Sequence, residues 1–282
     1  MIEVIQPGLY TSIQDLGRFG YRKYGVPVSG AMDQNSAKLA NQILGNSENA
    51  ALLEVTLIGP TLTFTEACEI AITGAEFEPT LNDSVLQNNA VISIEKGSIL
   101  KFGAAKKGMR AYLAIASGFD SEMVMGSASF YSNLTKQSHL KKGDRLFFRK
   151  EAKLLNIKTD FNEVMPTVLD HPIINVFKGP EFDLLLSDMQ DKLLNSAFTV
   201  SNQSNRMGCR LIGEYTLSAQ EIITAPVLPG TVQLTPSGQL IILGRDAQTT
   251  GGYARVLQLT DAAQNCLGQA NIGDLTSFSL KL

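Results

Sequence analysis

The sequence predicts a mainly β protein with a few short helices, arranged as two domains. Short apolar runs rich in β-branched residues recur at intervals of about 8 to 12 residues, separated by Gly, Pro and Asn-Asp turns. Only a few segments combine capping residues with the apolar spacing of a helix. The length of 282 residues is about that of two domains.

The first half of the chain consists mainly of predicted strands. Ile2–Ile5 forms the first and stops at Pro7-Gly8, and we expect the polar stretch from Thr11 to Tyr21 to be a loop. Further strands are predicted at Leu52–Leu57, Thr61–Phe64, Ile70–Thr73, Val91–Ile94, Ile99–Phe102, Tyr112–Ala116 and Arg145–Phe148. This spacing is typical of a sandwich or barrel rather than of alternating β and α units.

Three short helices are predicted from their caps. Asp33 is placed as an N-cap, Thr260-Asp261 opens another helix, and Ser187 begins a Ser-x-x-Gln pattern that resembles a capping box. The predicted starts and ends are Asp33 and Gly45, Ser187 and Asn195, and Thr260 and Gly268.

We place the domain boundary in the segment Lys150–Pro172, which is charged and then carries two prolines. The predicted domains are residues 1–160 and 161–282. The ends of the two halves are similar in sequence, because Lys142-Gly-Asp144 and Ile272-Gly-Asp274 both precede a predicted final strand.

The composition favours a globular protein and excludes several classes. Hydrophobic residues make up 44% of the chain and charged residues 18%, which is ample for packed cores. The net charge is −3, from 24 Lys and Arg against 27 Asp and Glu, without a long basic run, so we expect no nucleic-acid partner. No apolar run is long enough for a membrane span and no signal-peptide pattern is present, so we expect a cytoplasmic protein with no membrane partner.

The sequence does not favour a metal site. It contains only two histidines and three widely spaced cysteines, with no Cys-x-x-Cys pair. Structural and catalytic zinc sites need clusters of such ligands. We therefore expect reduced thiols and no bound metal.

The stretch Gly244–Tyr253 is the strongest candidate for a binding loop. It lies between two predicted strands, Gln239–Leu243 and Ala254–Leu259, and is longer than the two to five residues that a hairpin needs. Its paired glycines allow close approach of a ligand to the backbone, and its polar side chains suit a small polar ligand. The alternative is a long surface turn that caps its own backbone.

Three further polar segments stand out: Gln14–Arg18, Ser29–Asp33 and Ser204–Gly208. Small neighbours leave room for Arg18 to reach a carboxylate or phosphate, although an Arg18–Asp15 pair that only braces the loop is an equal alternative. Ser29-Gly30 precedes the predicted first helix, whose N-terminus could attract an anion.

Two nucleotide or cofactor motifs can be excluded. Gly103-Ala-Ala-Lys-Lys-Gly108 has the glycine spacing of a P-loop, but Met109 and Arg110 stand where Lys and Ser or Thr are needed. Ala31-Met32 is followed by Asp33 rather than by lysine, so we expect that this chain does not itself carry biotin.

Taken together, these motifs resemble a known family. They are Thr11-Ser-Ile-Gln-Asp-Leu-Gly-Arg18, Gly25-Val-Pro-Val-Ser-Gly-Ala-Met-Asp33, Glu54-Val-Thr56, Thr73-Gly74, Ser204-Asn-Arg-Met-Gly208 and Gln248-Thr-Thr-Gly-Gly-Tyr253. They look like the C subunit of the bacterial ATP-dependent 5-oxoprolinase, a family also called allophanate hydrolase subunit 2, the KipA type, or biotin-dependent carboxyltransferase. The resemblance runs from about residue 5 to the C-terminus.

The resemblance implies a pair of cyclophilin-like β-barrel domains in tandem. It implies a subunit of an ATP-dependent lactam hydrolase, inactive alone, whose complex converts 5-oxo-L-proline, ATP and water to L-glutamate, ADP and phosphate. The implied partners are the KipI-type B subunit of 5-oxoprolinase and its A subunit, and ATP could be bound here or by a partner. Two alternatives stay open: the carboxyltransferase element of a urea carboxylase or allophanate hydrolase-type system, and a regulatory module that binds a KipI-type partner as a kinase-inhibitor antagonist.

The implied chemistry selects the site residues. Phosphorylation of the amide oxygen makes the lactam carbon electrophilic, so the site needs cations and neutral donors for charge on oxygen and a carboxylate to orient or deprotonate water. The catalytic candidates are Arg18, Glu54, Arg206 and Asp246. The substrate-binding candidates are Gln14, Asp15, Ser29, Met32, Asp33, Thr73, Gln233, Gln248, Thr249, Thr250, Gly251, Gly252 and Tyr253. We expect them to line one cleft, which is completed by a partner subunit.

Overall fold

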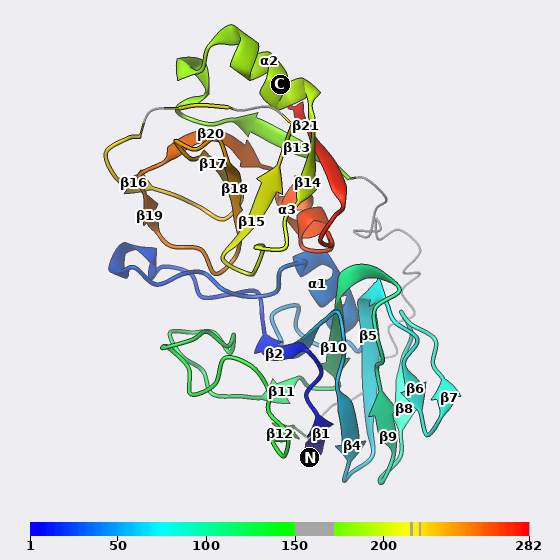
Figure 1. Ribbon diagram of the computed structural model, residues 1–282. Helices are drawn as coiled ribbons and strands as arrows, with labels where there is room; N and C mark the ends of the chain where they lie inside the picture. The colour runs from blue at the N-terminus through cyan, green and yellow to red at the C-terminus, as the bar shows by residue number, and fades with distance from the viewer. Residues whose placement is uncertain (150–171, 215–216, 220, 282) are drawn as a thin grey trace. The chain divides into compact units, whose positions relative to one another are not determined.

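The computed structural model describes residues 1–149, 172–214, 217–219 and 221–281 (Figure 1). The chain forms two compact units. The first contains Met1–Arg18 and the chain that follows from Ser29, whereas Phe19–Val28 groups with the C-terminal part in the second unit. The predicted boundary between residues 160 and 161 lies outside the described residues, as does the predicted linker except for Pro172.

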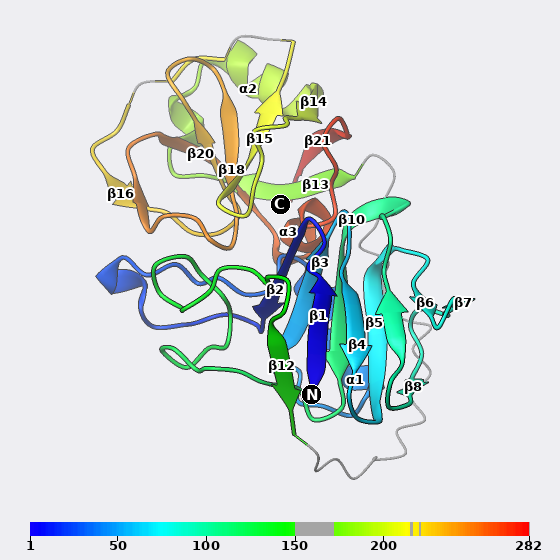
Figure 2. The same ribbon diagram turned by 60° about the horizontal axis from the view of Figure 1, so that its bottom comes forward.

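The first unit is built from two antiparallel sheets, and the larger one has the order β11-β12-β1-β4-β9-β6-β7. Figure 2 shows its strands β12, β1 and β4 side by side. The bounds are β1 (Ile2–Gln6), β4 (Thr61–Phe64), β6 (Thr80–Leu81), β7 (Ser84–Val85), β9 (Ile99–Lys101), β11 (Phe119–Asp120) and β12 (Arg145–Phe148).

The smaller sheet has the order β2-β3-β10-β5-β8. Its strands are β2 (Tyr10–Gln14), β3 (Leu52–Thr56), β5 (Cys68–Glu76), β8 (Ile92–Ile94) and β10 (Lys107–Ile115). One face packs against the larger sheet, where Leu53, Ile72 and Leu113 join a common core with Ile2 and Leu62. The other face packs against the first helix, so the central strands of this sheet are buried on both sides.

Strand β2 corrects one sequence prediction. All of β2 after Tyr10 lies within the stretch expected to be a loop, but the strand pairs with β3 from Tyr10 opposite Thr56 to Gln14 opposite Leu52. Its Ser12 and Gln14 side chains are fully buried and bond to one another at 2.9 Å. The loop prediction was wrong because it took polar side chains as a sign of exposure, whereas here they are buried with hydrogen-bond partners.

The second unit contains a closed barrel with the order β13-β20-β17-β18-β15-β14-β21. Its strands are β13 (Ile173–Lys178), β14 (Ala197–Val200), β15 (Gly208–Ile212), β17 (Thr231–Leu234), β18 (Leu240–Leu243), β20 (Ala254–Leu259) and β21 (Leu275–Leu280). The barrel closes because β21 pairs with β14 on one side and, in parallel, with β13 on the other. The strands β16 (Ala225–Pro226) and β19 (Thr250–Gly251) form a separate two-stranded ribbon.

The described helices are α1 (Gln34–Ile43), α2 (Ser187–Asn195) and α3 (Asp261–Leu267), with 3-10 turns η1 (Arg22–Tyr24) and η3 (Phe182–Leu184). The predicted cap of α1 is confirmed, because Asp33 accepts from Ser36 N. The predicted start of α3 is also confirmed, and Thr260 caps it by accepting from Ala263 N. Helix α2 exists, but its predicted capping box is wrong. Ser187 is already the first helical residue, so the N-cap position falls on Leu186, which has no side-chain acceptor.

The two similar Gly-Asp turns, at Gly143-Asp144 and Gly273-Asp274, adopt the same local structure. Asp144 accepts from the Lys141 amide and Asp274 from the Asn271 amide, both at 2.7 Å. The intervening Gly143 and Gly273 have φ values of 86° and 90°, which favour glycine. Each turn leads into a strand, β12 or β21, as the sequence predicted.

Candidate functional site

A row of polar side chains crosses the smaller sheet on the face that α1 covers. Strand register places Ser12 of β2 opposite Glu54 of β3, Glu54 opposite Tyr112 of β10, and Tyr112 opposite Thr73 of β5. All four are buried. Antiparallel pairing brings opposite side chains on one face into contact, so residues far apart in the sequence form one polar row.

Glu54 and Tyr112 form the centre of this row. Glu54 Oε2 accepts from the Met32 amide at 2.8 Å and from the Tyr112 hydroxyl at 3.0 Å, and Arg110 Nε lies 3.7 Å from Oε1. The Tyr112 hydroxyl also accepts from the Asp33 amide at 2.8 Å. Burial, reinforced by the Glu54 carboxylate, raises the pKa of Tyr112 well above its ordinary value, so the hydroxyl remains a donor.

The start of α1 is tied to the same row. The Asp33 carboxylate accepts from Ser36 N at 3.1 Å and from Ser36 Oγ at 2.6 Å. Thr73 Oγ1 donates to Ser36 O at 2.7 Å. Four predicted residues, Met32, Asp33, Glu54 and Thr73, are therefore brought together by one hydrogen-bond network.

Asp15 lies at the end of β2 in a second polar cluster. Its Oδ1 accepts from Ser127 Oγ at 2.7 Å and from Ser129 Oγ at 2.6 Å, and its Oδ2 accepts from the Ala128 amide at 2.7 Å. These bonds hold the 127–129 loop against the end of β2. Asp15 also lines a polar pocket of about 530 Å³, together with Asn46, Asn49, Ser117, Asp120 and Arg149.

Arg18 and Ser29 belong to this cluster. Arg18 is 1% exposed, and its guanidinium donates to Ser29 Oγ at 2.9 Å and to Ser129 O. After Ser29 the backbone passes close to Gly17, and only glycine fits at position 30, because a Cβ there would lie 2.8 Å from Gly17 N. Gln14 Nε2 lies within 3.4 Å of Phe130 O. The cluster thus unites Gln14, Asp15, Arg18 and Ser29.

In the second unit, Arg206 and Asp246 form a bidentate ion pair. Arg206 Nε lies 2.7 Å from Asp246 Oδ2, and Nη2 lies 3.1 Å from Oδ1. Each residue is 8% exposed. The Asp246 amide also donates to Arg206 O at 3.1 Å, so the pair joins the turn before β15 to the turn after β18. Planar two-point pairing fixes both side chains.

The predicted loop Gly244–Tyr253 does connect two strands, β18 and β20, and it contains β19. Thr250 and Gly251 pair with Pro226 and Ala225 of β16. The ladder continues on both sides, since Val227 N donates to Thr249 O at 3.1 Å and Ile222 N to Gly252 O at 3.0 Å. Gly251 lies against the side chain of the predicted residue Gln233.

The predicted site residues fall into two groups, one in each unit. Gln14, Asp15, Arg18, Ser29, Met32, Asp33, Glu54 and Thr73 belong to the first, whereas Arg206, Gln233, Asp246 and the segment 248–253 belong to the second. Each group is assembled within its own unit. The single cleft expected from the sequence stays a prediction.

Sequence comparison shows the family. The carboxyltransferase domain family, subdomains A and B, matches residues 24–280. The chain is 36% identical to the C subunit of 5-oxoprolinase from Escherichia coli over 286 aligned positions, which cover 99% of this chain and 90% of that protein. This chain belongs to the family of 5-oxoprolinase C subunits.

Solved structures of relatives have the same fold as this member of the C-subunit family. The crystal structure of TTHA0988 matches with a TM-score of 0.90 and 29% identity, covering 99% of this chain and 55% of that one. The urea carboxylase of Kluyveromyces lactis matches with a TM-score of 0.90 and 31% identity, covering 98% of this chain and 27% of that one. The chain thus spans about half of TTHA0988 and about a quarter of the urea carboxylase.

A relative with a different name is similar to this family member at almost the same level. Urea amidolyase of Saccharomyces cerevisiae is 35% identical over 98% of this chain, which corresponds to 16% of that protein. Sequence identity alone therefore does not distinguish similarity to 5-oxoprolinase C subunits from similarity to urea amidolyase.

Several residues of the buried networks were not predicted. Tyr112 was placed in a strand without a role, and Ser36, Ser127 and Ser129 were not considered. The alternation of β10 could have pointed to Tyr112, because it shares a face with Arg110. No comparable signal marks Ser127 and Ser129, whose role follows from a loop that reaches Asp15.

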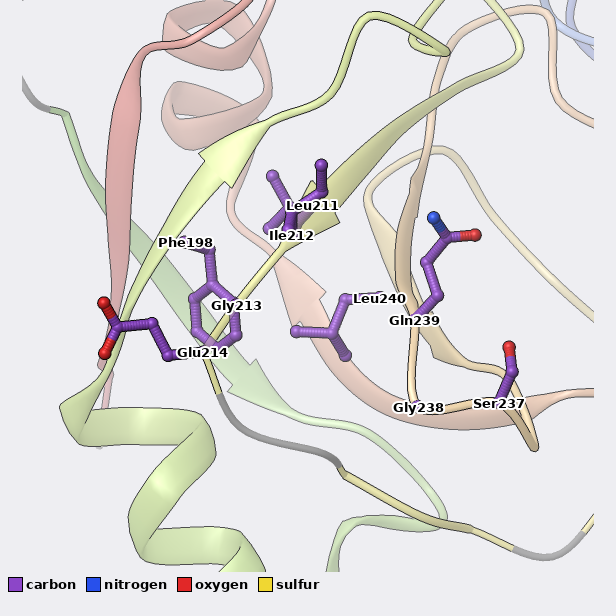
Figure 3. Close-up of a pocket in the computed structure, with 9 residues that line it drawn as sticks. All are labelled: Phe198, Leu211, Ile212, Gly213, Glu214, Ser237, Gly238, Gln239 and Leu240. Atoms are coloured by element: carbon purple, nitrogen blue, oxygen red, sulfur yellow. The ribbon is translucent and has the colours of Figure 1, made fainter.

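A further pocket, of about 230 Å³, lies at one opening of the barrel (Figure 3). The Phe198 ring and the Leu240 side chain lie between Glu214 and Gln239 in this view. No predicted site residue lines it. Phe198, Leu211 and Leu240 belong to the barrel core, so this pocket is an opening over the core.

Two kinds of feature are absent from the described part of the chain. No helix there is long and apolar enough to cross a membrane. Among the same residues, no three His, Cys, Asp or Glu side chains are grouped so that they could hold a metal ion.

Proposed function

We propose that this chain is a subunit of an ATP-dependent 5-oxoprolinase and that it acts with partner subunits to hydrolyse 5-oxo-L-proline to L-glutamate. The similarity to the E. coli C subunit of 5-oxoprolinase supports the proposal, because it extends over 99% of this chain and 90% of that protein. A second 5-oxoprolinase C subunit, from Haemophilus influenzae, is 33% identical over the same share of this chain. The proposed partners are the A subunit and the KipI-type B subunit of the enzyme, and one of the subunits binds ATP.

We assign the catalytic roles to charged residues that are buried and held in place. Arg206 is fixed by Asp246 and would stabilise the negative charge that builds on the lactam oxygen. Asp246 would orient water, and the amides of Gly251 and Gly252 would serve as neutral donors. The structural alternative is that the Arg206–Asp246 pair only joins its two turns.

In the first unit, we assign catalytic roles to Glu54 and Arg18. Glu54 is fully buried and accepts from the Met32 amide and the Tyr112 hydroxyl, which keeps its carboxylate in one position. Arg18 supplies a buried cation next to Ser29. Buried charged groups are costly to retain, and their presence supports a functional role for this cluster.

The test is ATP-dependent formation of glutamate from 5-oxo-L-proline by this chain with its cognate subunits, compared with the same mixture lacking this chain. We expect activity only in the complete mixture. An assembled complex of folded subunits that forms no glutamate would contradict the proposal.

Variants separate the catalytic role of the Arg206–Asp246 pair from a structural one. Asp246→Asn keeps the shape of the side chain, and we expect a loss of kcat on the order of 100-fold with retained assembly. Asp188→Asn is the matched control, because that carboxylate is 62% exposed on α2. Equal activity of Asp246→Asn and wild type would show that the pair only holds the turns together.

The second candidate function is that of a carboxyltransferase element in a urea-type system. The match of the carboxyltransferase domain family over residues 24–280 and the likeness to urea carboxylase favour it. Under this proposal, the chain would take the carboxyl group from biotin carried by another protein. Carboxylation of urea that depends on this chain, with no glutamate formed from 5-oxo-L-proline, would select this function.

A further inference from the structure

One buried polar group in the second unit lacks the hydrogen bond that its burial demands. Gln233 on β17 is 1% exposed, and its Nε2 atom is buried without a hydrogen-bond partner among the described residues. Val232 and Leu234 on either side belong to the barrel core. A buried amide that gives up water and gains no partner is destabilising, so a group of this kind calls for a physical explanation.

The β16–β19 ribbon covers this amide. A Cβ built on Gly251 would lie 2.5 Å from Gln233 Nε2, closer than side chains approach one another. The glycine therefore lets the ribbon backbone lie directly on the Gln233 amide group. Any other residue at position 251 would fill the space in front of Nε2.

The ribbon itself is a short ladder. Ala225 pairs with Gly251 and Pro226 with Thr250, and one backbone hydrogen bond extends the ladder on each side, from Val227 to Thr249 and from Ile222 to Gly252. Arg255 of β20 holds the edge of the ribbon, since its Nη1 donates to Pro226 O at 3.0 Å. The same guanidinium is fixed by hydrogen bonds to Glu181. Figure 1 shows β16 and β19 as a separate pair beside the strands of the barrel. A short ribbon held at its edge can shift without opening the barrel core.

We propose that the Gln233 carboxamide is the group that recognises a cyclic amide, a lactam or cyclic urea, when the β16–β19 ribbon shifts to admit it. Along one edge, a primary carboxamide presents one of its two N–H donors beside its C=O acceptor, in one plane. These match the N–H and C=O that a cis amide in a small ring presents along one edge. An open-chain secondary amide is trans and directs the two groups to opposite sides, so the same carboxamide discriminates against it.

The inference deepens the proposed function, on which the choice of a lactam rests. It adds that Gln233 is a specificity-determining residue and that Gly251 is required to keep the space in front of Nε2 free of a side chain. Gln233 acts by binding the ligand and takes no part in proton transfer.

The direct test follows the side-chain amide signal of Gln233 by NMR in the full chain labelled with 15N, assigned by its loss in Gln233→Met. The probes are 5-oxo-L-proline, 2-imidazolidinone and, as the open-chain control, N-methylacetamide. We expect a saturable shift of this signal with the two cyclic amides and none with the open-chain amide. An unchanged signal with both cyclic probes, in the isolated chain and in the assembled complex at concentrations that saturate turnover, overturns the proposal.

Variants separate binding from folding. Gln233→Met removes the buried donor at similar volume, so we expect an unchanged or higher midpoint of thermal unfolding together with a dissociation constant for the cyclic amides raised roughly tenfold or more. Gly251→Ala places a methyl group against Nε2 and should weaken binding as much. Gln203→Met, at an exposed position, is the control and should bind as wild type does. A Gln233→Met protein that loses stability but keeps its affinity would show that the amide is structural.

These outcomes are distinguishable from failure of the proposed function. If the complex forms glutamate but Gln233→Met leaves KM for 5-oxo-L-proline and the NMR response unchanged, the inference fails and the proposed function stands. If no glutamate forms but 2-imidazolidinone shifts the Gln233 signal, the inference stands and the oxoprolinase function fails.

Discussion

Tyr112 is the residue on which the buried network of the first unit depends. Its hydroxyl accepts from the Asp33 amide at the start of α1 and donates to Glu54 on β3. One oxygen atom thus links a helix, a neighbouring strand and the predicted catalytic carboxylate. The residue itself carries no charge, and its neighbours Ala111 and Leu113 are apolar, so its importance follows from its position in the fold.

Removal of this oxygen tests the link. Tyr112→Phe takes away the acceptor of the Asp33 amide and a donor to Glu54, both fully buried, so we expect a loss of about 2 to 4 kcal/mol in the free energy of unfolding. Tyr24→Phe is the control, because Tyr24 is 69% exposed and should change stability by less than about 0.5 kcal/mol. The free energies of unfolding of both variants and of the wild type are measured by chemical denaturation. A Tyr112→Phe protein as stable as the wild type would show that the network does not contribute to stability.

At the scale of elements, the ion pair between Glu181 and Arg255 connects the turn before η3 to β20 and to the β16–β19 ribbon. Arg255 Nη2 lies 2.6 Å from Glu181 Oε1, and Nε lies 2.9 Å from Oε2. The hydrogen bonds from Arg255 lower the pKa of Glu181, and those same bonds raise the pKa of Arg255. This pairing is less than one-fifth exposed on both sides, which limits screening by solvent.

The lowered pKa of Glu181 predicts the pH dependence of this contact. A carboxyl with a pKa lower in the folded than in the unfolded chain stabilises the fold above the unfolded value, about 4.5, and loses this effect as pH falls through the folded value. Glu181→Gln should therefore lower the free energy of unfolding by about 1 to 3 kcal/mol at pH 7. The difference from wild type should shrink as pH falls below 4.5.

The control for this pH series is Asp183→Asn, which removes an ion pair with Lys178 whose side chains are 79% and 52% exposed. Exposed pairs contribute about 0 to 1 kcal/mol, so this variant should stay close to wild type. A Glu181→Gln deficit that is independent of pH would contradict the electrostatic explanation.

At the scale of the whole molecule, the largest hydrophobic clusters form one main core in each unit. The first lies between the two sheets and includes Leu113, and the second fills the barrel and includes Leu234. Both leucines are at most 1% exposed. Each core draws its residues from one unit, so each unit has its own source of apolar stabilisation.

Two core variants test whether the units unfold independently. Leu113→Ala and Leu234→Ala should each cost about 2 to 5 kcal/mol, but in different units. We expect calorimetry of the wild type to show two overlapping transitions, of which each variant lowers a different one. A single transition that both variants lower equally would show that the units unfold together.

The sequence alone predicted the features that depend on neighbouring residues. Strands Thr61–Phe64 and Arg145–Phe148 and the loop before β20 follow from apolar patterns and turn residues within a few positions. The cap at Asp33, the start of the helix at Thr260-Asp261 and the two Gly-Asp turns are equally local. The motifs also indicated the family, which the comparisons confirmed.

Only the tertiary structure decided which of these pieces meet. Strand register places Ser12, Glu54, Thr73 and Tyr112 in one row, parallel pairing of β13 with β21 closes the barrel, and a ribbon from two distant segments covers Gln233. Polar residues of β2 are buried because β3 and the loop at Phe130 lie against them, and Gln14 bonds both to Ser12 in the same strand and to Phe130 O, which is why the sequence suggested a loop there. Caps and turns arise from energies between adjacent residues, whereas register and burial arise from packing between segments that the order of residues does not bring together.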